Sequence, residues 1–415
     1  MKVSIIVIGD ELLIGQVTDT NSGFLARHMA PMGWEVNDVQ VVADDSEAIT
    51  AAIERAFANS QIVLTTGGLG PTKDDITKQT LCNIFGGTLE EDPEVTANIK
   101  EVFKKRGIQL NQLTAAQAWV PTSARVIQNR VGTAPVMWFE REKPKRVLVA
   151  MPGVPFETEH VFTREVFPLL LETFPSPDAI AHRTVMVSGI SESALAMQLE
   201  EFESSLPANL HLAYLPKPGI IRLRLDGHGK NANELNALMS EQAYLLRTAC
   251  GEHFLCDGDF TPAEILLNRL NASKLTFATA ESCTGGNIAH LITSIAGSST
   301  VMRGGVVAYC NDVKAALLGV SAADLSAYGA VSIPVVEQMA TGACRALGAD
   351  VAVATSGIAG PGGATPTKPV GTVCIAAATS SGKVISDTFH FPGNRERVID
   401  RASTTALLLA LKLLK

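Results

Sequence analysis

A serine and a lysine in the last third of the chain carry side chains that can act together as a nucleophile and its base. Ser282 stands in AESCTGG, on the turn between an apolar run and a helical pattern, and Lys314 stands in VKAALLGV. Apolar neighbours remove water from a lysine amine, which lowers its pKa toward that of a usable base. The region contains no Gly-x-Ser-x-Gly motif, and His290 and His390 lie inside a helix pattern and a strand pattern. The residues therefore favour a Ser/Lys pair over a Ser/His pair.

The turn at Ser282 allows two interpretations. Free N–H groups at the start of the following helix can hold an oxyanion or a phosphate beside the serine. Alternatively, Ser282 or Thr284 is only the N-cap of that helix. The Gly-rich loop over residues 357–371 suits close contact with a phosphate or a ring. The Arg395 guanidinium can bind a phosphate with two hydrogen bonds, and an ordinary surface arginine is the alternative.

A second group of polar residues follows three apolar runs in the first 155 residues, at Gly9-Asp10-Glu11, at residues 66–72 and at residues 152–155. In an open parallel sheet, ligands bind outside the carboxyl ends of the strands, so these segments are expected to share one crevice. The glycines, with the helix-start amides after Thr72, would cradle a phosphate. Alternatively, the glycines are plain turns and Asp74 and Asp75 cap a helix. A hard divalent cation prefers carboxylate ligands, and the candidates are Asp10, Asp44, Asp45, Asp74 and Asp75.

The elements that must position these residues form three predicted domains. Short β-branched runs alternate with helical patterns over residues 1–172 and again over residues 257–415, which is typical of an α/β fold. Residues 183–252 follow a strand, helix, strand, strand, helix order. The predicted class is α/β, with two parallel or mixed-sheet α/β domains joined by a small βαββα (α+β) domain. Two prolines make residues 174–182 the expected linker.

Composition excludes several classes of protein. With 46% hydrophobic residues, 18% charged residues and a net charge of −8, the chain is globular and has no basic surface typical of direct nucleic-acid binding. Its 7 cysteines include no Cys-x-x-Cys pair, which argues against structural zinc and disulfides and favours a reducing cytoplasm. No apolar run is long enough to cross a membrane, so the apolar last helix is expected to dock in the core or at a dimer interface.

The first region resembles a known family. GDELLIGQVTDTN and TTGGLGPTKDD are similar to the molybdopterin-binding domain family, in the variant that opens CinA proteins, and NRVGTAP (129–135) and MPGVPFE (151–157) match similar turns. The resemblance implies a nucleotide pyrophosphatase acting on ADP-ribose with a divalent metal of the Mg or Co type, accompanied by K⁺. The implied nucleotide contacts are Gly9, Asp10, Glu11, Asp19, Asn21, Gly67, Gly68, Gly70, Thr72 and Gly153.

One residue departs from that pattern. The family has glycine after the Ala-Pro step, and here Val136 stands at that place. Valine does not adopt the positive φ that glycine tolerates, so the loop is expected to differ. This departure motivates the alternative that the first domain only binds a nucleotide or a pterin.

The last region resembles the CinA C-terminal domain, the nicotinamide-nucleotide amidohydrolase family, through AESCTGG, GSSTVMRGGVVAY, GAVS, TSGIAGPGG and KPVGTV. The resemblance implies that nicotinamide mononucleotide is hydrolysed to nicotinate mononucleotide and ammonia without a cofactor, in a homodimer. Ser282 would be the nucleophile, Lys314 its base, and Tyr309 and Ser299 further catalytic residues, with Ser299 as the alternative nucleophile. The implied substrate contacts are Thr284, Gly285, Gly286, Ser356, Gly357, Gly360 and Arg395.

Three functions are therefore compared. The first is a bifunctional enzyme acting on nicotinamide mononucleotide and ADP-ribose. The second is an amidase whose first domain only binds its ligand. The third is a non-enzymatic protein of competence or DNA damage, which the acidic charge and the lack of a basic, aromatic stripe disfavour for direct nucleic-acid contact.

Overall fold

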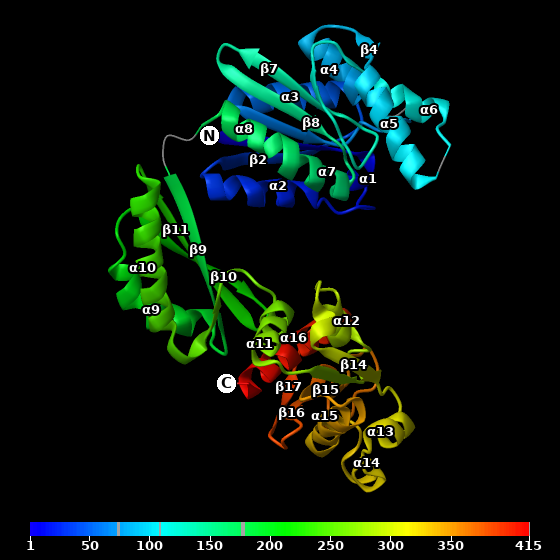
Figure 1. The fold of residues 1–415 in the computed structure, drawn as a ribbon, viewed down its shortest axis with the longest axis vertical. Coiled ribbons are helices and arrows are strands. Elements are labelled where there is room, and N and C mark those ends of the chain that lie inside the picture. Colours follow the sequence, from blue (N-terminus) through cyan, green and yellow to red (C-terminus); the bar gives the residue numbers. More distant parts are fainter. Residues whose placement is uncertain (73–74, 108, 176–178, 415) are drawn as a thin grey trace. The chain divides into compact units, whose positions relative to one another are not determined.

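The computed structural model describes residues 1–72, 75–107, 109–175 and 179–414 (Figure 1). It divides into two compact units. One contains Met1–Ala181 with His228–Leu235, and the other contains His182–Gly227 with Asn236–Lys415.

The N-terminal domain is built on a six-stranded sheet with the order β2-β1-β3-β8-β7-β6. The first four strands in this order are parallel, and β7 and β6 are antiparallel. β1 and β3 are apolar and buried along nearly their whole length, because helices cover both faces of the sheet. The strands are β1 (Lys2–Ile8), β2 (Glu35–Val42), β3 (Ile62–Thr66), β6 (Arg125–Ile127), β7 (Val136–Glu142) and β8 (Lys145–Met151).

Two helical layers pack on this sheet. Leu25 and Met29 of α2, with Val161 at the end of α7, join the core on one face, and Ile49, Ile53 and other α3 residues join the core on the other (Figure 1). The helices are α1 (Asp10–Leu13), α2 (Asn21–Met29), α3 (Ser46–Asn59), α4 (Thr77–Phe85), α5 (Pro93–Arg106), α6 (Gln112–Ala115), α7 (Pro155–Val161) and α8 (Phe167–Thr173). A small separate sheet pairs β4 (Leu89–Glu91) with β5 (Trp119–Pro121).

The middle domain carries a four-stranded sheet with the order β10-β11-β9-β12. Its elements are β9 (Ala179–Ser188), α9 (Glu192–Ser204), β10 (Leu210–Lys217), β11 (Ile220–Gly229), α10 (Ala232–Cys250) and β12 (Phe254–Asp257). The predicted βαββα order is present, and β12 adds an antiparallel edge strand beside β9. The linker expected over residues 174–182 is shorter than predicted, because β9 begins at Ala179.

The C-terminal domain has a five-stranded sheet with the order β14-β13-β15-β16-β17. β14, β13 and β15 are parallel, and β16 and β17 are antiparallel. The strands are β13 (Phe277–Glu281), β14 (Met302–Val307), β15 (Val351–Gly357), β16 (Thr372–Thr379) and β17 (Val384–His390). The helices are α11 (Pro262–Ser273), α12 (Asn287–Thr293), α13 (Asn311–Leu318), α14 (Ala322–Tyr328), α15 (Ile333–Leu347) and α16 (Arg395–Leu413).

The last helix lies in the core of this domain. Val398, Ala402, Leu407 and Leu411 of α16 are buried in one apolar cluster with residues of α11 and α12, and α15 covers the opposite face of the sheet (Figure 1). None of the helices that the structure describes is both long and apolar enough to cross a membrane. The chain therefore has the predicted α/β class, with two mixed-sheet α/β domains and a small α+β domain between them in sequence.

Candidate functional site

Ser282 and Lys314 meet in the interior of the C-terminal domain. Lys314 Nζ lies 3.1 Å from Ser282 Oγ, although 32 residues separate the two in sequence. Ser282 is 8% exposed and Lys314 is 1% exposed. The amine also donates to the carbonyl oxygens of Ala308, at 2.8 Å, and Tyr309, at 3.3 Å. A lysine amine is thus held against a serine hydroxyl with bulk water excluded.

Burial sets the protonation of this lysine. It lowers the pKa of Lys314 below its ordinary value of 10.5, and the neighbouring Cys310 and Cys283 thiols oppose the shift. The two carbonyl acceptors also suit an ammonium, but removal from water is the largest effect. A larger fraction of Lys314 is neutral at a given pH than of an exposed lysine. A neutral amine 3.1 Å from a hydroxyl can accept its proton.

Sheet topology brings the two residues together. Ser282 directly follows β13, and Tyr309 and Lys314 follow the neighbouring parallel strand β14. The chain passes from β13 to β14 on one side and then to β15 on the other, so the strand order reverses at β13. The carboxyl ends of strands at such a reversal are where open α/β sheets bind ligands.

The helix-start amides expected beside Ser282 are not free, and this corrects the prediction. The carboxylate of Glu281, which is 0% exposed, accepts hydrogen bonds from the N–H groups of Gly286 (3.0 Å), Ile288 (3.0 Å) and Ala289 (2.9 Å). These are the orphan donors of α12, and a carboxylate at a helix N-terminus satisfies them. The N-cap alternative is also wrong, because neither Ser282 nor Thr284 caps α12.

Glu281 was missed by sequence reasoning. It is the last residue of a fully buried strand and stands six residues before α12 begins. A charged residue that ends a buried strand is a signal for such a role, because it must find partners inside the protein. The Thr284 hydroxyl donates to the same carboxylate, at 2.8 Å, and lies 2.7 Å from the Thr355 hydroxyl. Thr284 therefore fastens the turn to β15.

Two backbone donors in this turn remain without an acceptor among the described residues. The N–H of Ser282 donates to Thr355 O at 3.0 Å, and the N–H of Gly285 donates to Ser282 O at 3.1 Å. The N–H groups of Cys283 and Thr284 have no such partner in the described part of the chain. They directly follow the serine, which is the place where serine hydrolases hold their oxyanion.

An arginine and a tyrosine join the rim of this site. Arg395 Nη2 donates to the Tyr309 hydroxyl at 3.0 Å, and its Nη1 donates to Gly360 O at 3.0 Å. Both side chains are exposed. Arg395 thus connects the first turn of α16 to the Gly-rich loop and to the residue that follows β14.

The remaining residues predicted for this site are Ser356, Ser299 and four glycines. The Ser356 hydroxyl is buried and donates to Ala330 O at 2.7 Å. Ser299 is exposed in the 3₁₀ turn Ser298–Thr300 before β14, and among the described residues no hydrogen bond joins it to Ser282 or Lys314. Gly285 and Gly286 have φ of 63° and 100°, which favours glycine at this turn. Gly357 ends β15, and Gly360 is buried.

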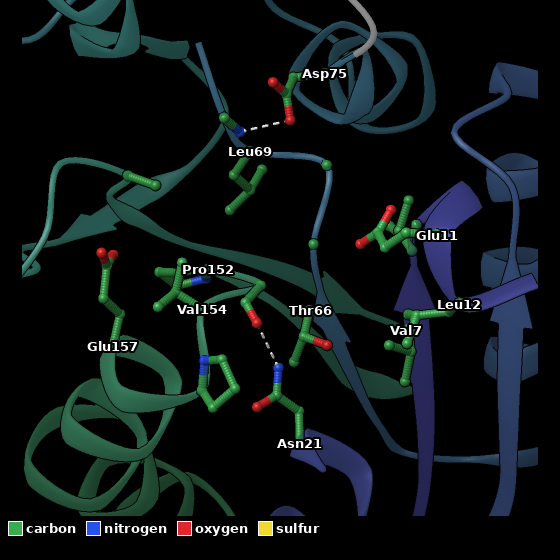
Figure 2. Close-up of a pocket in the computed structure, with 18 of the residues that line it drawn as sticks. Val7, Glu11, Leu12, Asn21, Thr66, Leu69, Asp75, Pro152, Val154 and Glu157 are labelled. Carbon is green, nitrogen blue, oxygen red and sulfur yellow. Dashed lines mark hydrogen bonds between the residues drawn. The ribbon is translucent and has the colours of Figure 1, made fainter. Parts of the chain in front are cut away.

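The N-terminal domain contains a cavity of about 480 Å³ at the carboxyl ends of its strands (Figure 2). This volume is within the range of small-molecule sites, about 300–1,000 Å³. Of the predicted nucleotide contacts, those that line it are Gly9, Glu11, Asp19, Asn21, Gly67, Gly68, Gly70 and Gly153. Asn21 Nδ2 donates to Gly153 O at 2.8 Å and so connects the start of α2 to the loop after β8.

The close approach of two backbone segments explains why glycine stands at position 67. Gly67 has a φ of 102°, and a Cβ there would lie 2.0 Å from the carbonyl oxygen of Ile8. A larger residue would push β1 and β3 apart. Gly67 therefore allows the ends of β1 and β3 to approach each other closely beside the cavity.

The phosphate cradle predicted at residues 67–72 is partly filled by the protein itself. Asp75 Oδ1 accepts from the N–H of Gly70 at 2.7 Å, and Asp75 Oδ2 accepts from the N–H of Thr72 at 2.8 Å and from the Thr72 hydroxyl. These amides are not available to a phosphate. The helix that follows begins at Thr77 and its N-cap residue is Ile76, so Asp75 organises the loop and does not cap α4.

The predicted metal ligands have different roles in the structure. The N–H of Asp10 donates to Asp44 Oδ2 and the N–H of Asp44 donates to Asp10 Oδ1, both at 3.3 Å. Asp45 is the N-cap of α3. Asp75 is held in its loop, and Asp74 lies outside the described residues.

Asp10 and Asp44 fit a divalent cation in part. Among the described residues, no three His, Cys, Asp or Glu side chains are placed to hold a metal ion by themselves. Mg²⁺ is commonly bound by one or two carboxylates with substrate phosphates as further ligands. Burial raises the pKa of Asp44, the hydrogen bond from the Asp10 N–H opposes this shift, and the negative charges of Asp10, Glu11 and Asp75 add to it. A cation would relieve this repulsion, so the pair suits a metal that arrives with a phosphate ligand.

Val136 does not strain the chain. It is fully buried as the first residue of β7 and pairs with Ile127 of β6. Lys274 is the one non-glycine residue with positive φ in the described part of the chain. Val136 therefore does not adopt the positive φ of a glycine position, and the difference expected between this loop and that of the family stays a prediction.

Comparison with known families covers almost the whole chain. Residues 4–172 match the probable molybdopterin binding domain, residues 182–254 match the damage-inducible protein CinA KH domain, and residues 260–414 match the CinA C-terminal domain. The fold and sites thus define a three-domain α/β protein of the CinA type.

Relatives that match nearly the whole chain are CinA-like proteins, and a solved structure matches a part of it. A CinA-like protein of Flavobacterium psychrophilum is 40% identical over 417 residues, covering 99% of this chain and 98% of the relative. A CinA-like protein of Cytophaga hutchinsonii is 40% identical over 412 residues, covering 99% and 97%. The crystal structure of competence/damage inducible protein CihA from Agrobacterium tumefaciens is 39% identical, covers 38% of this chain and 100% of its own, and has a TM-score of 0.36. The chain belongs to the CinA family.

Proposed function

We propose that the C-terminal domain hydrolyses the carboxamide of nicotinamide mononucleotide to nicotinate mononucleotide and ammonia. The observation that carries this proposal is the 3.1 Å separation of Lys314 Nζ from Ser282 Oγ in a buried environment. Membership of the CinA family supports it through the motifs around both residues.

The proposed chemistry uses the serine and the lysine alone. Neutral Lys314 takes the hydroxyl proton as Ser282 Oγ attacks the carboxamide carbon, and the N–H groups of Cys283 and Thr284 stabilise the oxyanion. The C–N bond then breaks, and ammonia leaves with the proton returned by Lys314. Water attacks the resulting ester with Lys314 again accepting a proton, which releases the carboxylate product and restores Ser282.

Arg395 is proposed to bind the substrate phosphate from the rim of this site. Replacing it with alanine is expected to raise KM for nicotinamide mononucleotide about 10- to 100-fold, because a charge-assisted hydrogen bond to phosphate is lost. Nicotinamide riboside lacks the phosphate, so its turnover should change little in the same variant. Steady-state kinetics on both substrates measure this. An equal loss on the two substrates would show that Arg395 acts through Tyr309 and the Gly-rich loop instead.

As a second function we propose metal-dependent hydrolysis of ADP-ribose in the N-terminal domain. The cavity supports this proposal through its volume and through the Asp44 carboxylate in its lining, which is connected to Asp10 by two hydrogen bonds. A bound divalent cation would neutralise pyrophosphate charge and polarise the phosphorus. The competing proposals are a first domain that only binds a nucleotide or a pterin, and a non-enzymatic role in competence or DNA damage. A cytoplasmic homodimer remains a prediction.

Chelation separates the two proposed activities. With EDTA present, ammonia release from nicotinamide mononucleotide is expected to continue unchanged, while AMP release from ADP-ribose stops and returns when Mg²⁺ or Co²⁺ is added in excess. An enzymatic ammonia assay and chromatography of nucleotides measure the two products. Binding of ADP-ribose without any hydrolysis under all metals would favour the binding-only domain. Loss of ammonia release with EDTA would contradict a metal-free Ser/Lys mechanism.

A further inference from the structure

Two sequence motifs of the N-terminal domain meet at a glutamate on the cavity wall. Glu157, in the first turn of α7, lines the cavity, and its Oε2 accepts a hydrogen bond from Asn129 Nδ2 at 2.7 Å. Figure 2 shows Glu157 and Glu11 on opposite sides of the pocket, with Thr66, Pro152 and Val154 between them. This hydrogen bond joins the segments NRVGTAP and MPGVPFE, although 28 residues separate Asn129 from Glu157.

Asn129 is built to hold this carboxylate in place. It is 0% exposed, and its Nδ2 also donates to Ala134 O at 3.1 Å while its Oδ1 accepts from the N–H of Val131 at 3.2 Å. Its own carbonyl accepts from Asn98 Nδ2 at 2.7 Å. Hydrogen bonds thus hold both the amide nitrogen and the amide oxygen of Asn129. The hydrogen bond to Glu157 therefore has a defined direction.

The charges around Glu157 differ from those around Asp44. Burial raises the pKa of Glu157, while the Asn129 hydrogen bond and the positive charge of Arg106 on α5 oppose the shift. Burial also raises the pKa of Asp44, but there the negative charges of Asp10, Glu11 and Asp75 add to the shift, and the hydrogen bond from the Asp10 N–H opposes it. The cavity therefore holds an acidic group on one side, suited to a cation, and a separate carboxyl on the other. Asp19 also lines the cavity, but its carboxylate accepts hydrogen bonds from the N–H and hydroxyl of Ser22.

We propose that Glu157 is the general base of the N-terminal site and that Asn129 is its positioning residue. This inference rests on the proposed hydrolysis of ADP-ribose. The oxygen of a water molecule forms a bond to one phosphorus, and its proton passes to the Glu157 carboxylate. The bridging P–O bond breaks, and its electron pair stays on the leaving phosphate. AMP and ribose 5-phosphate are the products, and Glu157 returns its proton to solvent.

The test compares Glu157→Gln with Glu159→Gln in the full-length protein. Glutamine keeps the size of Glu157 and an oxygen that accepts from Asn129, but it cannot take a proton. Glu159 is exposed on the same helix, so it is a matched control. We expect kcat for ADP-ribose to fall about 10²- to 10³-fold in Glu157→Gln, with KM and AMP affinity by calorimetry changed less than about threefold, and no change in Glu159→Gln.

The pH dependence of kcat/KM for ADP-ribose tests whether Glu157 acts as a base. Wild-type kcat/KM is expected to rise with pH through the pKa of Glu157, which lies above its ordinary 4.5, because the base must be ionised. This acid limb should vanish in Glu157→Gln. It should move to higher pH in Asn129→Ala, since the lost hydrogen bond favours the ionised form. Added formate should restore part of the activity of Glu157→Ala by replacing the missing carboxylate.

Three results would overturn the inference, and they are distinguishable. Unchanged kcat in Glu157→Gln, with wild-type turnover intact, rejects the base and leaves the pyrophosphatase standing. A raised KM with an unchanged acid limb makes Glu157 a binding residue. No hydrolysis by wild type with Mg²⁺ or Co²⁺ rejects the pyrophosphatase, and the base with it.

Discussion

Ser282→Ala is expected to lower ammonia release from nicotinamide mononucleotide by roughly 10⁴-fold or more, and Lys314→Ala is expected to do the same. Each member of the pair depends on the other, because the hydroxyl is a weak nucleophile until the amine 3.1 Å away accepts its proton. The double variant should therefore lose little more activity than either single variant.

Controls separate lost chemistry from lost folding. Lys314→Ala leaves a cavity and two carbonyl groups without their donor, whereas Lys314→Met fills most of the space, so both are compared with wild type by circular dichroism and thermal unfolding. Lys412→Ala, at an exposed position of α16, should leave activity unchanged. Full activity in Ser282→Ala would contradict the proposed nucleophile. Loss of activity in Ser299→Ala with full activity in Ser282→Ala would assign the nucleophile to Ser299.

The Ser282–Lys314 pair also predicts how kcat/KM for ammonia release depends on pH. The base must be neutral, so kcat/KM is expected to rise with pH and to level off above the pKa of Lys314. Burial places that pKa below 10.5, so the rise comes at lower pH than an exposed lysine would give. An activity that falls with increasing pH over the same range would contradict a lysine base.

Glu281→Ala is expected to destabilise the C-terminal domain by about 3–4 kcal/mol, with a fall in its Tm of roughly 10 °C. The carboxylate accepts from three backbone N–H groups, which would lose their partner inside the protein, and from the Thr284 hydroxyl, which would keep only Thr355. Differential scanning calorimetry of the full-length protein, which resolves domain transitions, measures the effect.

A matched control and a conservative variant sharpen this test. Glu396→Ala removes an exposed glutamate from the first turn of α16 and should cost about 0.5 kcal/mol or less. Glu281→Gln keeps the size and one acceptor but directs an NH₂ group at N–H donors, so an intermediate loss is expected. A Tm for Glu281→Ala within 2 °C of wild type, a threshold set by the shift for about 1 kcal/mol, would show that water replaces the carboxylate at these amides.

Glu281 and Asp75 show why free N–H donors at these two turns could not be predicted from the sequence. At both places the strand, the glycines and the following helix were predicted from local patterns. In both cases a carboxylate of the protein itself accepts hydrogen bonds from N–H groups that the sequence pattern had assigned to a ligand. Glycine-rich turns and helix starts indicate where N–H groups gather, but a hydrogen bond depends on which acceptor the folded chain brings within about 3 Å.

Interactions between residues close together in sequence explain what the sequence determined by itself. The α/β class and the strand-turn-helix around Ser282 follow from hydrophobic period, β-branched runs and glycine turns, all of which act over a few residues. Burial of Lys314 does not follow in this way, because Ala316 and Leu317 beside it on α13 are exposed and only Leu318 is buried with it. Only the tertiary structure decided that Lys314 meets Ser282, that Arg395 meets Tyr309, and that Asn129 holds Glu157. These pairs lie 28 to 86 residues apart, and strand order in the sheets sets their distances, which no local pattern encodes.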